Sequence, residues 1–229
     1  MRDDGARGLL GGRFARRFAD RVEAGRVLGE RVASLGLGDP VVLALPRGGV
    51  PVAGEVARAL DAPFDVYVAR KIGAPGRPEL GVGALAEGGE PVFDEALLDA
   101  LGLQPGDLAA TVAREREELR RRVAAYRGDR ELEQVKGRDV VVVDDGLATG
   151  GTARAALKAL RGLSPRRLVL AVPVAPPDTL RALRSLADDM VAVLTPAHFG
   201  AVGAWYRRFE QLDDAEVLAA LEHRLDRGE

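Results

Sequence analysis

Short apolar runs alternate along the chain with amphipathic segments. The runs at 41–45, 64–69, 140–143, 168–174 and 190–194 have the length and composition of buried parallel strands. Apolar residues spaced three to five positions apart predict helices between them. The predicted helices cover about 20–35, 50–60, 95–101, 107–127, the segment directly after Thr152, 177–186 and 213–225. This alternation predicts one α/β domain with a mainly parallel central sheet flanked by helices.

Two segments depart from this alternation. Residues 1–18 are rich in Gly and Arg, which predicts a flexible N-terminal tail before a domain that spans 19–229. Residues 70–90 contain many glycines, two prolines and scattered charges. A long glycine-rich loop in a compact domain is often a lid over a binding site, so we expect a flexible lid loop at 72–90.

The composition argues against several classes of function. The chain has no cysteine, which excludes disulfides, a thiolate nucleophile and thiolate metal sites, and its two histidines, His198 and His223, lie far apart. A formal net charge of -2 argues against binding to nucleic acid. No apolar run reaches the ~18 residues of a membrane span, and the charged N-terminus lacks a signal-peptide core. We therefore expect a cytoplasmic protein without a membrane segment.

Arginine is abundant for reasons unrelated to binding. Of 33 basic residues only three are lysines, and the chain has one isoleucine and no asparagine. A GC-rich genome explains these shortages together, and selection against heat-labile residues would also remove asparagine. Arginine richness is therefore not a binding signal. Lys71, one of the few lysines that the chain retains, is by contrast a candidate for a functional role.

The segment after the most apolar strand has the strongest candidate chemistry. Asp144 and Asp145 follow strand 140–143, and open α/β sheets bind ligands at the carboxyl ends of their strands. Adjacent carboxylates accept hydrogen bonds from vicinal hydroxyls or coordinate a divalent ion. Residues 149–152, TGGT, open a helix whose amides, dipole and hydroxyls favour an anion. The pattern predicts a diol site beside a phosphate site, as a ribose 5-phosphate requires; the alternative is a plain strand–turn–helix joint.

The run VVVVDDGLATGGT, residues 140–152, resembles the motif of the type I phosphoribosyltransferases that binds phosphoribosyl pyrophosphate (PRPP). The resemblance implies that Asp144 and Asp145 hold the ribose. It also implies a 5-phosphate loop made of Ala148, Thr149, Gly150, Gly151 and Thr152. Two positions depart from the family pattern: many members have an aliphatic residue at Gly146, and some purine-using members have a proton-accepting acid at Ala148.

The run PRGG, residues 46–49, follows the first predicted strand. Alone, it is more typical of a tight turn with a surface arginine. Next to the downstream motif it resembles the family's pyrophosphate loop, which often contains a cis non-proline peptide. Arg47 offers N–H donors for phosphate, and Gly48 and Gly49 leave backbone amides accessible.

The resemblance gives roles to two further segments. The lid at 72–90 would close over PRPP, with Arg70 as a pyrophosphate ligand and with Lys71 and Asp145 as catalytic residues. A small hood from the chain ends would place Trp205 and Tyr206 on a nucleobase, although aromatic residues near a C-terminus are more often part of the core.

The resemblance implies a Mg²⁺-dependent enzyme of nucleotide metabolism. It would transfer ribose 5-phosphate from PRPP to a nucleobase-like nitrogen acceptor and release pyrophosphate, with Asp144 and Asp145 as candidate magnesium ligands and a homodimer as the expected assembly. One alternative is a PRPP-binding regulatory protein without turnover, which the missing acid at Ala148 permits. The absence of net basic charge and of a DNA-binding segment argues against it. A pure interaction protein is disfavoured by the intact acids and loop glycines.

Overall fold

A five-stranded parallel sheet forms the centre of the molecule in the computed structural model, which describes residues 17–225, with side chains to residue 221. The spatial order of the strands is β2–β1–β6–β7–β8, and every neighbouring pair is parallel. Their bounds are β1 (Pro40–Ala44), β2 (Phe64–Val66), β6 (Asp139–Val143), β7 (Arg167–Val174) and β8 (Asp189–Leu194). The prediction of a single α/β domain with a mainly parallel sheet is confirmed.

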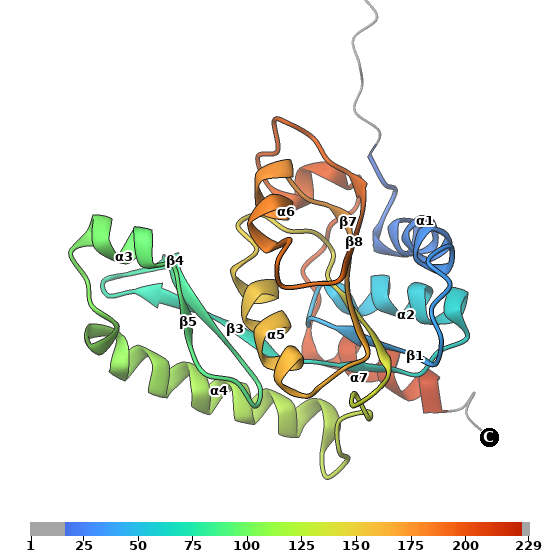
Figure 1. Cartoon of the computed structure of the whole chain (residues 1–229), viewed down its shortest axis with the longest axis horizontal. Coiled ribbons are helices and arrows are strands. Elements are labelled where there is room, and N and C mark those ends of the chain that lie inside the picture. The colour runs from blue at the N-terminus through green and yellow to red at the C-terminus, as the bar shows by residue number, and fades with distance from the viewer. Residues whose placement is uncertain (1–16, 226–229) are drawn as a thin grey trace, which may run out of the picture.

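Helices cover both faces of this sheet (Figure 1). Side chains of successive strand residues point to opposite faces, so Val141 packs with α1 and α2 while Val140 packs with α5. One face carries α1 (Arg21–Ala33), α2 (Gly49–Leu60) and α7 (Asp214–Leu225), and the other carries α5 (Gly151–Gly162) and α6 (Pro177–Leu183). Two apolar layers therefore hold the strands and fix where their carboxyl ends emerge.

An antiparallel unit, here called the arm, projects from this body (Figure 1). Its elements are β3 (Ala69–Ala74), β4 (Arg77–Ala86), β5 (Val92–Phe93), α3 (Glu95–Leu101), a 3-10 turn (Pro105–Leu108) and α4 (Ala109–Arg127). The prediction of a loop at 72–90 is wrong, because most of this segment forms the β3–β4 hairpin. The predicted strand 64–69 is likewise divided, since β2 ends at Val66 and β3 begins at Ala69.

The glycines that suggested a loop are required by the packing of the hairpin. A Cβ on Gly73 would lie 2.4 Å from the Pro78 carbonyl oxygen, and one on Gly83 would lie 2.7 Å from the Val92 carbonyl oxygen. Ile72 and Val82, each next to one of these glycines in the sequence, are fully buried. The glycines thus allow close strand contact, and the few large apolar residues anchor the hairpin.

The folded body begins before residue 19. Phe18 is 2% exposed and forms a parallel bridge with Tyr206. The predicted tail therefore ends too late, and residues 1–16 lie outside the described part of the chain. The segment before α1 thus meets the segment before α7 at Phe18 and Tyr206.

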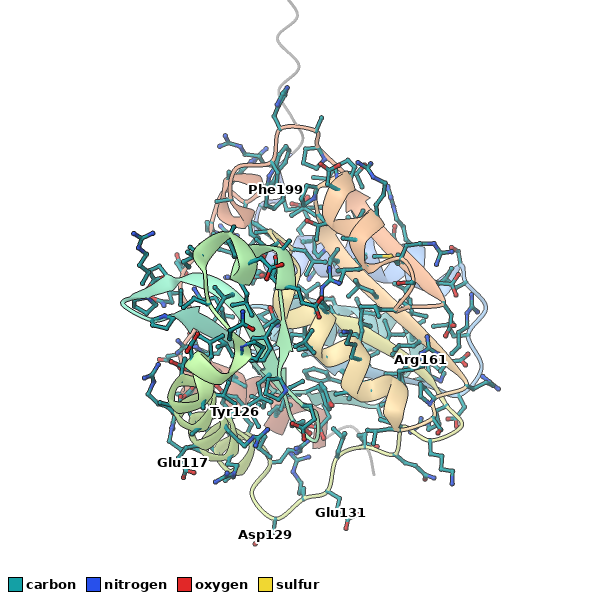
Figure 2. All side chains as sticks on the ribbon, turned by 60° about the vertical axis from the view of Figure 1, so that its left-hand side comes forward. Glu117, Tyr126, Asp129, Glu131, Arg161 and Phe199 are labelled. Atoms are coloured by element: carbon teal, nitrogen blue, oxygen red, sulfur yellow. The ribbon has the colours of Figure 1, made fainter. Side chains whose placement is uncertain are left out.

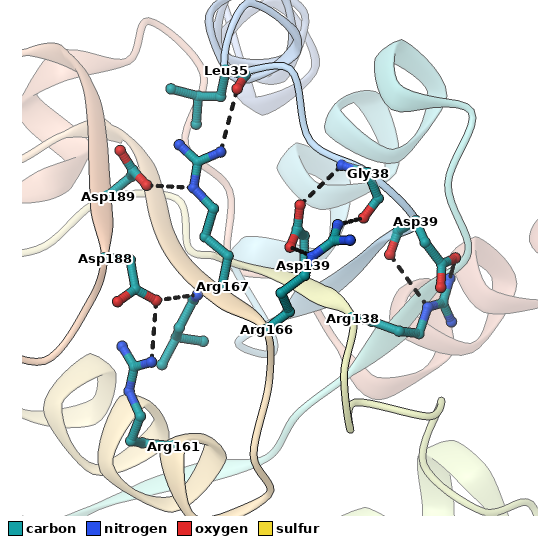
Figure 3. A network of polar contacts seen from close by, with 11 residues as sticks. Leu35, Gly38, Asp39, Arg138, Asp139, Arg161, Arg166, Arg167, Asp188 and Asp189 are labelled. Atoms are coloured by element: carbon teal, nitrogen blue, oxygen red, sulfur yellow. Dashed lines mark hydrogen bonds and ion pairs between the residues drawn. The ribbon is translucent and has the colours of Figure 1, made fainter.

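Ion pairs close the amino-terminal edge of the sheet (Figure 3). Arg166 Nε lies 2.8 Å from Asp139 Oδ1, Arg167 Nε lies 2.6 Å from Asp189 Oδ2, and Arg161 Nη1 lies 3.1 Å from Asp188 Oδ2. Each guanidinium already has a carboxylate partner, so we assign this network a structural role. Among the described helices, none has the length and apolar character needed to cross a bilayer.

Helices α1 and α2 approach closely because two positions on α1 have no side chain. A Cβ on Gly25 would lie 2.8 Å from both Glu55 Cβ and the Val52 carbonyl oxygen, and one on Gly29 would lie 2.8 Å from Ala59 Cβ. This close approach places the first turn of α1 beside the carboxyl ends of the strands.

We expect Gly25→Ala to lower the free energy of unfolding by about 1–3 kcal/mol, because the added methyl group overpacks the α1–α2 contact. Gly54→Ala is the matched control, since Gly54 lies in α2 and a Cβ there meets no atom within 4 Å. That change should raise stability by up to ~1 kcal/mol through helix propensity. Urea unfolding of both variants measures the difference, and equal effects would contradict the proposed contact.

Candidate functional site

The two glycine-containing loops identified in the sequence meet at the carboxyl edge of the sheet. Strands β1 and β6 are neighbours, with Ala44 opposite Val143, and the Leu45 amide donates to the Val143 carbonyl oxygen at 2.8 Å. The loop 46–49 therefore lies beside the loop 144–150. This is the position at which open α/β sheets bind ligands.

The loop 46–49 packs directly against the acids at the end of β6. A Cβ on Gly48 would lie 2.0 Å from Asp145 Oδ2, and one on Gly49 would lie 2.6 Å from the Val143 carbonyl oxygen. Neither position can accept a side chain without moving the acids. The Pro46–Arg47 peptide is cis, as the resemblance implied, and Arg47 Nη1 lies 3.9 Å from the Asp214 carboxylate.

The acidic pair is held in a largely desolvated setting. Asp144 is half-buried, Asp145 is 8% exposed, and the Asp145 amide donates to Asp144 Oδ1 at 2.8 Å. Desolvation and the neighbouring Asp145 raise the pKa of Asp144 well above its ordinary value. Desolvation also raises the pKa of Asp145, and Arg21 opposes this effect. Carboxyl groups perturbed in this way at a sheet edge are typical of functional sites.

The structure adds Arg21, which the sequence analysis missed. Arg21 is 9% exposed, and its Nε donates to Asp145 Oδ2 at 2.8 Å. Its Nη1 donates to the Glu210 carbonyl oxygen at 2.8 Å, and its guanidinium carbon lies 3.9 Å from the centroid of the Phe209 ring. In an arginine-rich chain no sequence signal distinguishes this arginine, because its partners lie more than 120 residues away.

The C-terminal aromatic residues divide into buried and partly exposed members. Tyr206 is buried, its hydroxyl donates to the Asp145 carbonyl oxygen, and its burial raises the pKa of its phenol. Trp205 is half-buried and stacks on Phe199, with ring centroids 6.4 Å apart. Figure 2 shows Phe199 near one end of the molecule. The structure thus leaves Trp205 partly accessible, whereas the Tyr206 hydroxyl is bound to the loop 144–150, here called the acidic loop.

The loop 148–152 opens helix α5 with unused backbone amides. The first amides of a helix have no partner within it, and α5 begins at Gly151. Gly150 has a left-handed conformation with φ 74°, and a Cβ there would lie 2.8 Å from Thr179 Cγ2. Ala148 and Thr149 are exposed, and the Thr179 hydroxyl donates to the Ala148 carbonyl oxygen at 2.6 Å. This geometry can hold an anion.

The first departure from the family pattern has a packing reason. A Cβ on Gly146 would lie 2.7 Å from Val202 Cγ1 and 3.0 Å from Val174 Cγ1. The side chain of Val202 therefore occupies the space that an aliphatic residue at Gly146 would need. The C-terminal segment, residues 202–210, thus packs against the acidic loop at Gly146.

The two basic residues predicted at the lid make contacts within the arm. Arg70 Nη2 lies 2.7 Å from Glu115 Oε2 of α4. Lys71 is exposed, and its Nζ donates to the Glu79 carbonyl oxygen at 3.0 Å. In the described part of the chain, the structure thus brings together the sugar candidates, the 5-phosphate candidates and the pyrophosphate candidates of the loop 46–49. It does not add Arg70, the fourth pyrophosphate candidate, or Lys71, because both are engaged within the arm.

Comparison with known proteins places this geometry in one family. The family model for the phosphoribosyl transferase domain matches residues 21–203. A Mycobacterium tuberculosis protein, named only provisionally as a phosphoribosyl transferase, is 45% identical over 205 residues; the match covers 90% of this chain and 46% of that protein. The chain thus spans about half the length of the curated relatives it matches. The crystal structure of TT1426 from Thermus thermophilus is similar with a TM-score of 0.77 and 48% identity, covering 90% of this chain and 98% of that one.

We expect Asp144→Asn to raise the free energy of unfolding at neutral pH, by about 1 kcal/mol. A carboxyl whose pKa is raised on folding contributes stability that is fully present below its unfolded pKa and is lost as the pH rises through the folded pKa. The gain from asparagine should therefore grow as the pH rises from about 4, the ordinary pKa of an aspartate, through neutral pH. Denaturant unfolding across this range measures it.

Asp139→Asn, at the opposite end of β6, is the matched control. The hydrogen bond from Arg166 lowers the pKa of Asp139, so its carboxylate contributes stability above the unfolded pKa that is lost as the pH falls. This substitution should destabilise the protein at neutral pH, with a smaller effect in acid. The same sign for both substitutions would contradict the assignment of the two environments.

Proposed function

This chain belongs to the phosphoribosyl transferase domain family, and we propose that it transfers the ribosyl 5-phosphate group of PRPP to a nitrogen acceptor with release of pyrophosphate. The observation that carries the proposal is the convergence of three elements at one edge of the sheet: the acids Asp144 and Asp145, the amino-terminus of α5, and the loop 46–49. They provide acceptors for sugar hydroxyls and donors for two separate anionic groups.

The α5 side of the site suits the 5-phosphate. The first-turn amides of α5 and the hydroxyls of Thr149 and Thr152 are candidate donors to an anion, and Ala148 and Thr149 beside them are exposed. The carboxylates at the end of β6 lie a few residues before it in the same loop. A sugar with hydroxyls on one side and a phosphate on the other matches this order of donors and acceptors.

The loop 46–49 suits the pyrophosphate. Its glycines bring the start of α2 against Asp145, and Arg47 supplies a half-buried guanidinium beside them. In the structure Arg47 lies near Asp214, an acid that an incoming pyrophosphate would replace as its partner. The arm would contribute Arg70 and Lys71 on closure, which requires each to exchange its present contact within the arm for the ligand.

The site suits a Mg²⁺ ion that is held jointly by the protein and the substrate phosphates. The described residues contain no cluster of three or more acidic, histidine or cysteine side chains that would hold a metal alone. Mg²⁺ is commonly held by one or two carboxylates together with substrate phosphates, and the half-buried Asp144 is a suitable carboxylate, with Asp145 beside it. Bound there, Mg²⁺ would neutralise charge on the departing pyrophosphate.

The proposed reaction breaks the bond between ribose C1 and a pyrophosphate oxygen and forms a bond from C1 to the acceptor nitrogen, which gives up its proton. Positive charge grows on the sugar as the pyrophosphate leaves, so stabilisation is mainly electrostatic. The acids at the end of β6 would face the cationic sugar. The partly exposed ring of Trp205 is the candidate surface for a nucleobase-like acceptor.

Gly151→Val should weaken PRPP binding by about 10-fold or more, because a side chain at the start of α5 obstructs the approach of a phosphate. Stability should change little, since the nearest atom to a Cβ at Gly151 is Thr149 Oγ1 at 3.9 Å. Calorimetric titration with PRPP and Mg²⁺, combined with thermal unfolding, separates the two effects. Gly162→Val, at the other end of α5 where a Cβ meets no atom within 4 Å, is the control. Unchanged affinity in Gly151→Val would contradict the phosphate site.

Turnover is tested by pyrophosphate release with a panel of nucleobases and a base-free control. We expect base-dependent release, and we expect Lys71→Ala to lower its rate about 10²-fold, the scale of one lost electrostatic donor. PRPP affinity should change much less, because a cation on the arm would act chiefly in the transition state. Lys71→Arg should restore activity in part, and Lys136→Ala should have no effect. PRPP binding without base-dependent release from any base would favour a regulatory protein.

A further inference from the structure

We propose that the two acids of the site have different roles: Asp144 binds the sugar hydroxyls, and Asp145 anchors Arg21, a positioning residue that holds the acidic loop against the C-terminal segment. The inference rests on the proposed function and deepens it. The sequence resemblance gave both acids the same role, and the difference comes from the surroundings of the two carboxylates.

The Asp145 carboxylate is enclosed by protein on two sides. Its Oδ2 accepts a hydrogen bond from Arg21 Nε at 2.8 Å, and the same oxygen lies only 2.0 Å from where a Cβ on Gly48 would be. The residue is 8% exposed, and its carbonyl oxygen accepts from the Tyr206 hydroxyl. A sugar hydroxyl would have to displace Arg21 or the loop 46–49 to reach Oδ2.

Asp144 has the opposite setting. It is the more exposed of the two acids, and Oδ1 accepts a hydrogen bond from the Asp145 amide at 2.8 Å, which orients the carboxylate. Within residues 17–221 no arginine or lysine forms an ion pair with Asp144. Asp144 thus has no ion-pair partner of its own among the described residues, whereas Asp145 Oδ2 is already bound to Arg21.

Arg21 connects three parts of the chain at this point. Besides Asp145, its guanidinium donates to the Glu210 carbonyl oxygen at 2.8 Å and lies over the Phe209 ring, 3.9 Å from its centroid. The planar fork of an arginine can satisfy these partners together, whereas the single ammonium of a lysine cannot. Loss of Arg21 would leave the Asp145 charge buried beside Asp144 without compensation, which would push the sugar-binding carboxylate from its position.

Calorimetric titration of the full chain with PRPP and Mg²⁺ tests the two roles. We expect Asp144→Asn to weaken PRPP binding about 10²-fold, as the loss of charge-assisted hydrogen bonds would give. Asp145→Asn should weaken it by less than about 5-fold. Arg21→Met should weaken it about 10-fold, and the double variant Arg21→Met with Asp145→Asn should recover to within about 5-fold of the wild type, because no uncompensated charge remains.

The recovery in the double variant distinguishes positioning from a merely structural role, which would make the two substitutions additive. Arg26→Met is the control on the same helix, because Arg26 is exposed and pairs with Glu55, and it should bind PRPP as the wild type does. If Arg21→Met does not fold, PRPP binding by Asp145→Asn and by the double variant still tests whether the two acids have different roles. Equal losses for Asp144→Asn and Asp145→Asn, or no recovery in the double variant, would overturn this inference alone. A folded wild type that does not bind PRPP would instead overturn the proposed function.

Discussion

Burial of Asp145 at the end of β6 requires a compensating cation, and Arg21 of α1 supplies it. A buried carboxylate without a partner costs far more than one that is paired and hydrogen-bonded. The ion pair therefore links the first turn of α1 to the acidic loop, and through the Glu210 carbonyl oxygen it also holds the C-terminal segment. The packing of Phe18 against Tyr206 reinforces the same junction. Residues 18–21 and the segment 202–210 thus lie beside the acids, because Arg21 compensates the buried charge of Asp145 and binds the Glu210 carbonyl oxygen.

The close approach of backbone segments is the second requirement of this site. Gly48 lies against Asp145, Gly49 against the Val143 carbonyl oxygen, and Gly146 against Val202. Each glycine occupies a place where a Cβ would collide with a group of the site or of the C-terminal segment. The loops 46–49 and 144–150 can therefore lie in direct contact at the carboxyl edge of the sheet, beside the start of α5.

The sequence was sufficient to predict the elements whose signal is local. The run 140–152 predicted a strand, two acids and a helix start in the right order, and the apolar period predicted the helices on both faces. It was not sufficient where structure depends on distant partners. Residues 72–90 read as a loop because Gly73 and Gly83 lower strand propensity, although each allows close contact with a neighbouring segment. Arg21 remained hidden because its role depends on Asp145 and Phe209, which only the fold brings near.

The base of the β3–β4 hairpin limits how far the arm can move toward the site. Its base is fixed by a buried ion pair between Arg127 and Glu87, 2.7 Å apart, and Glu87 also accepts a hydrogen bond from the Val68 amide. Ile72 and Val82 are fully buried, whereas residues 75–79 at the tip are exposed. Opening the tip therefore requires the loss of few buried contacts, whereas opening the base requires breaking the ion pair and exposing Ile72 and Val82. Lys71 lies between the buried base and this tip, next to Ile72, and its side chain is exposed. Its ammonium group donates a hydrogen bond to the Glu79 carbonyl oxygen at the tip, so a change in its direction costs this bond and the weak ion pair with Glu79 but no buried apolar contact.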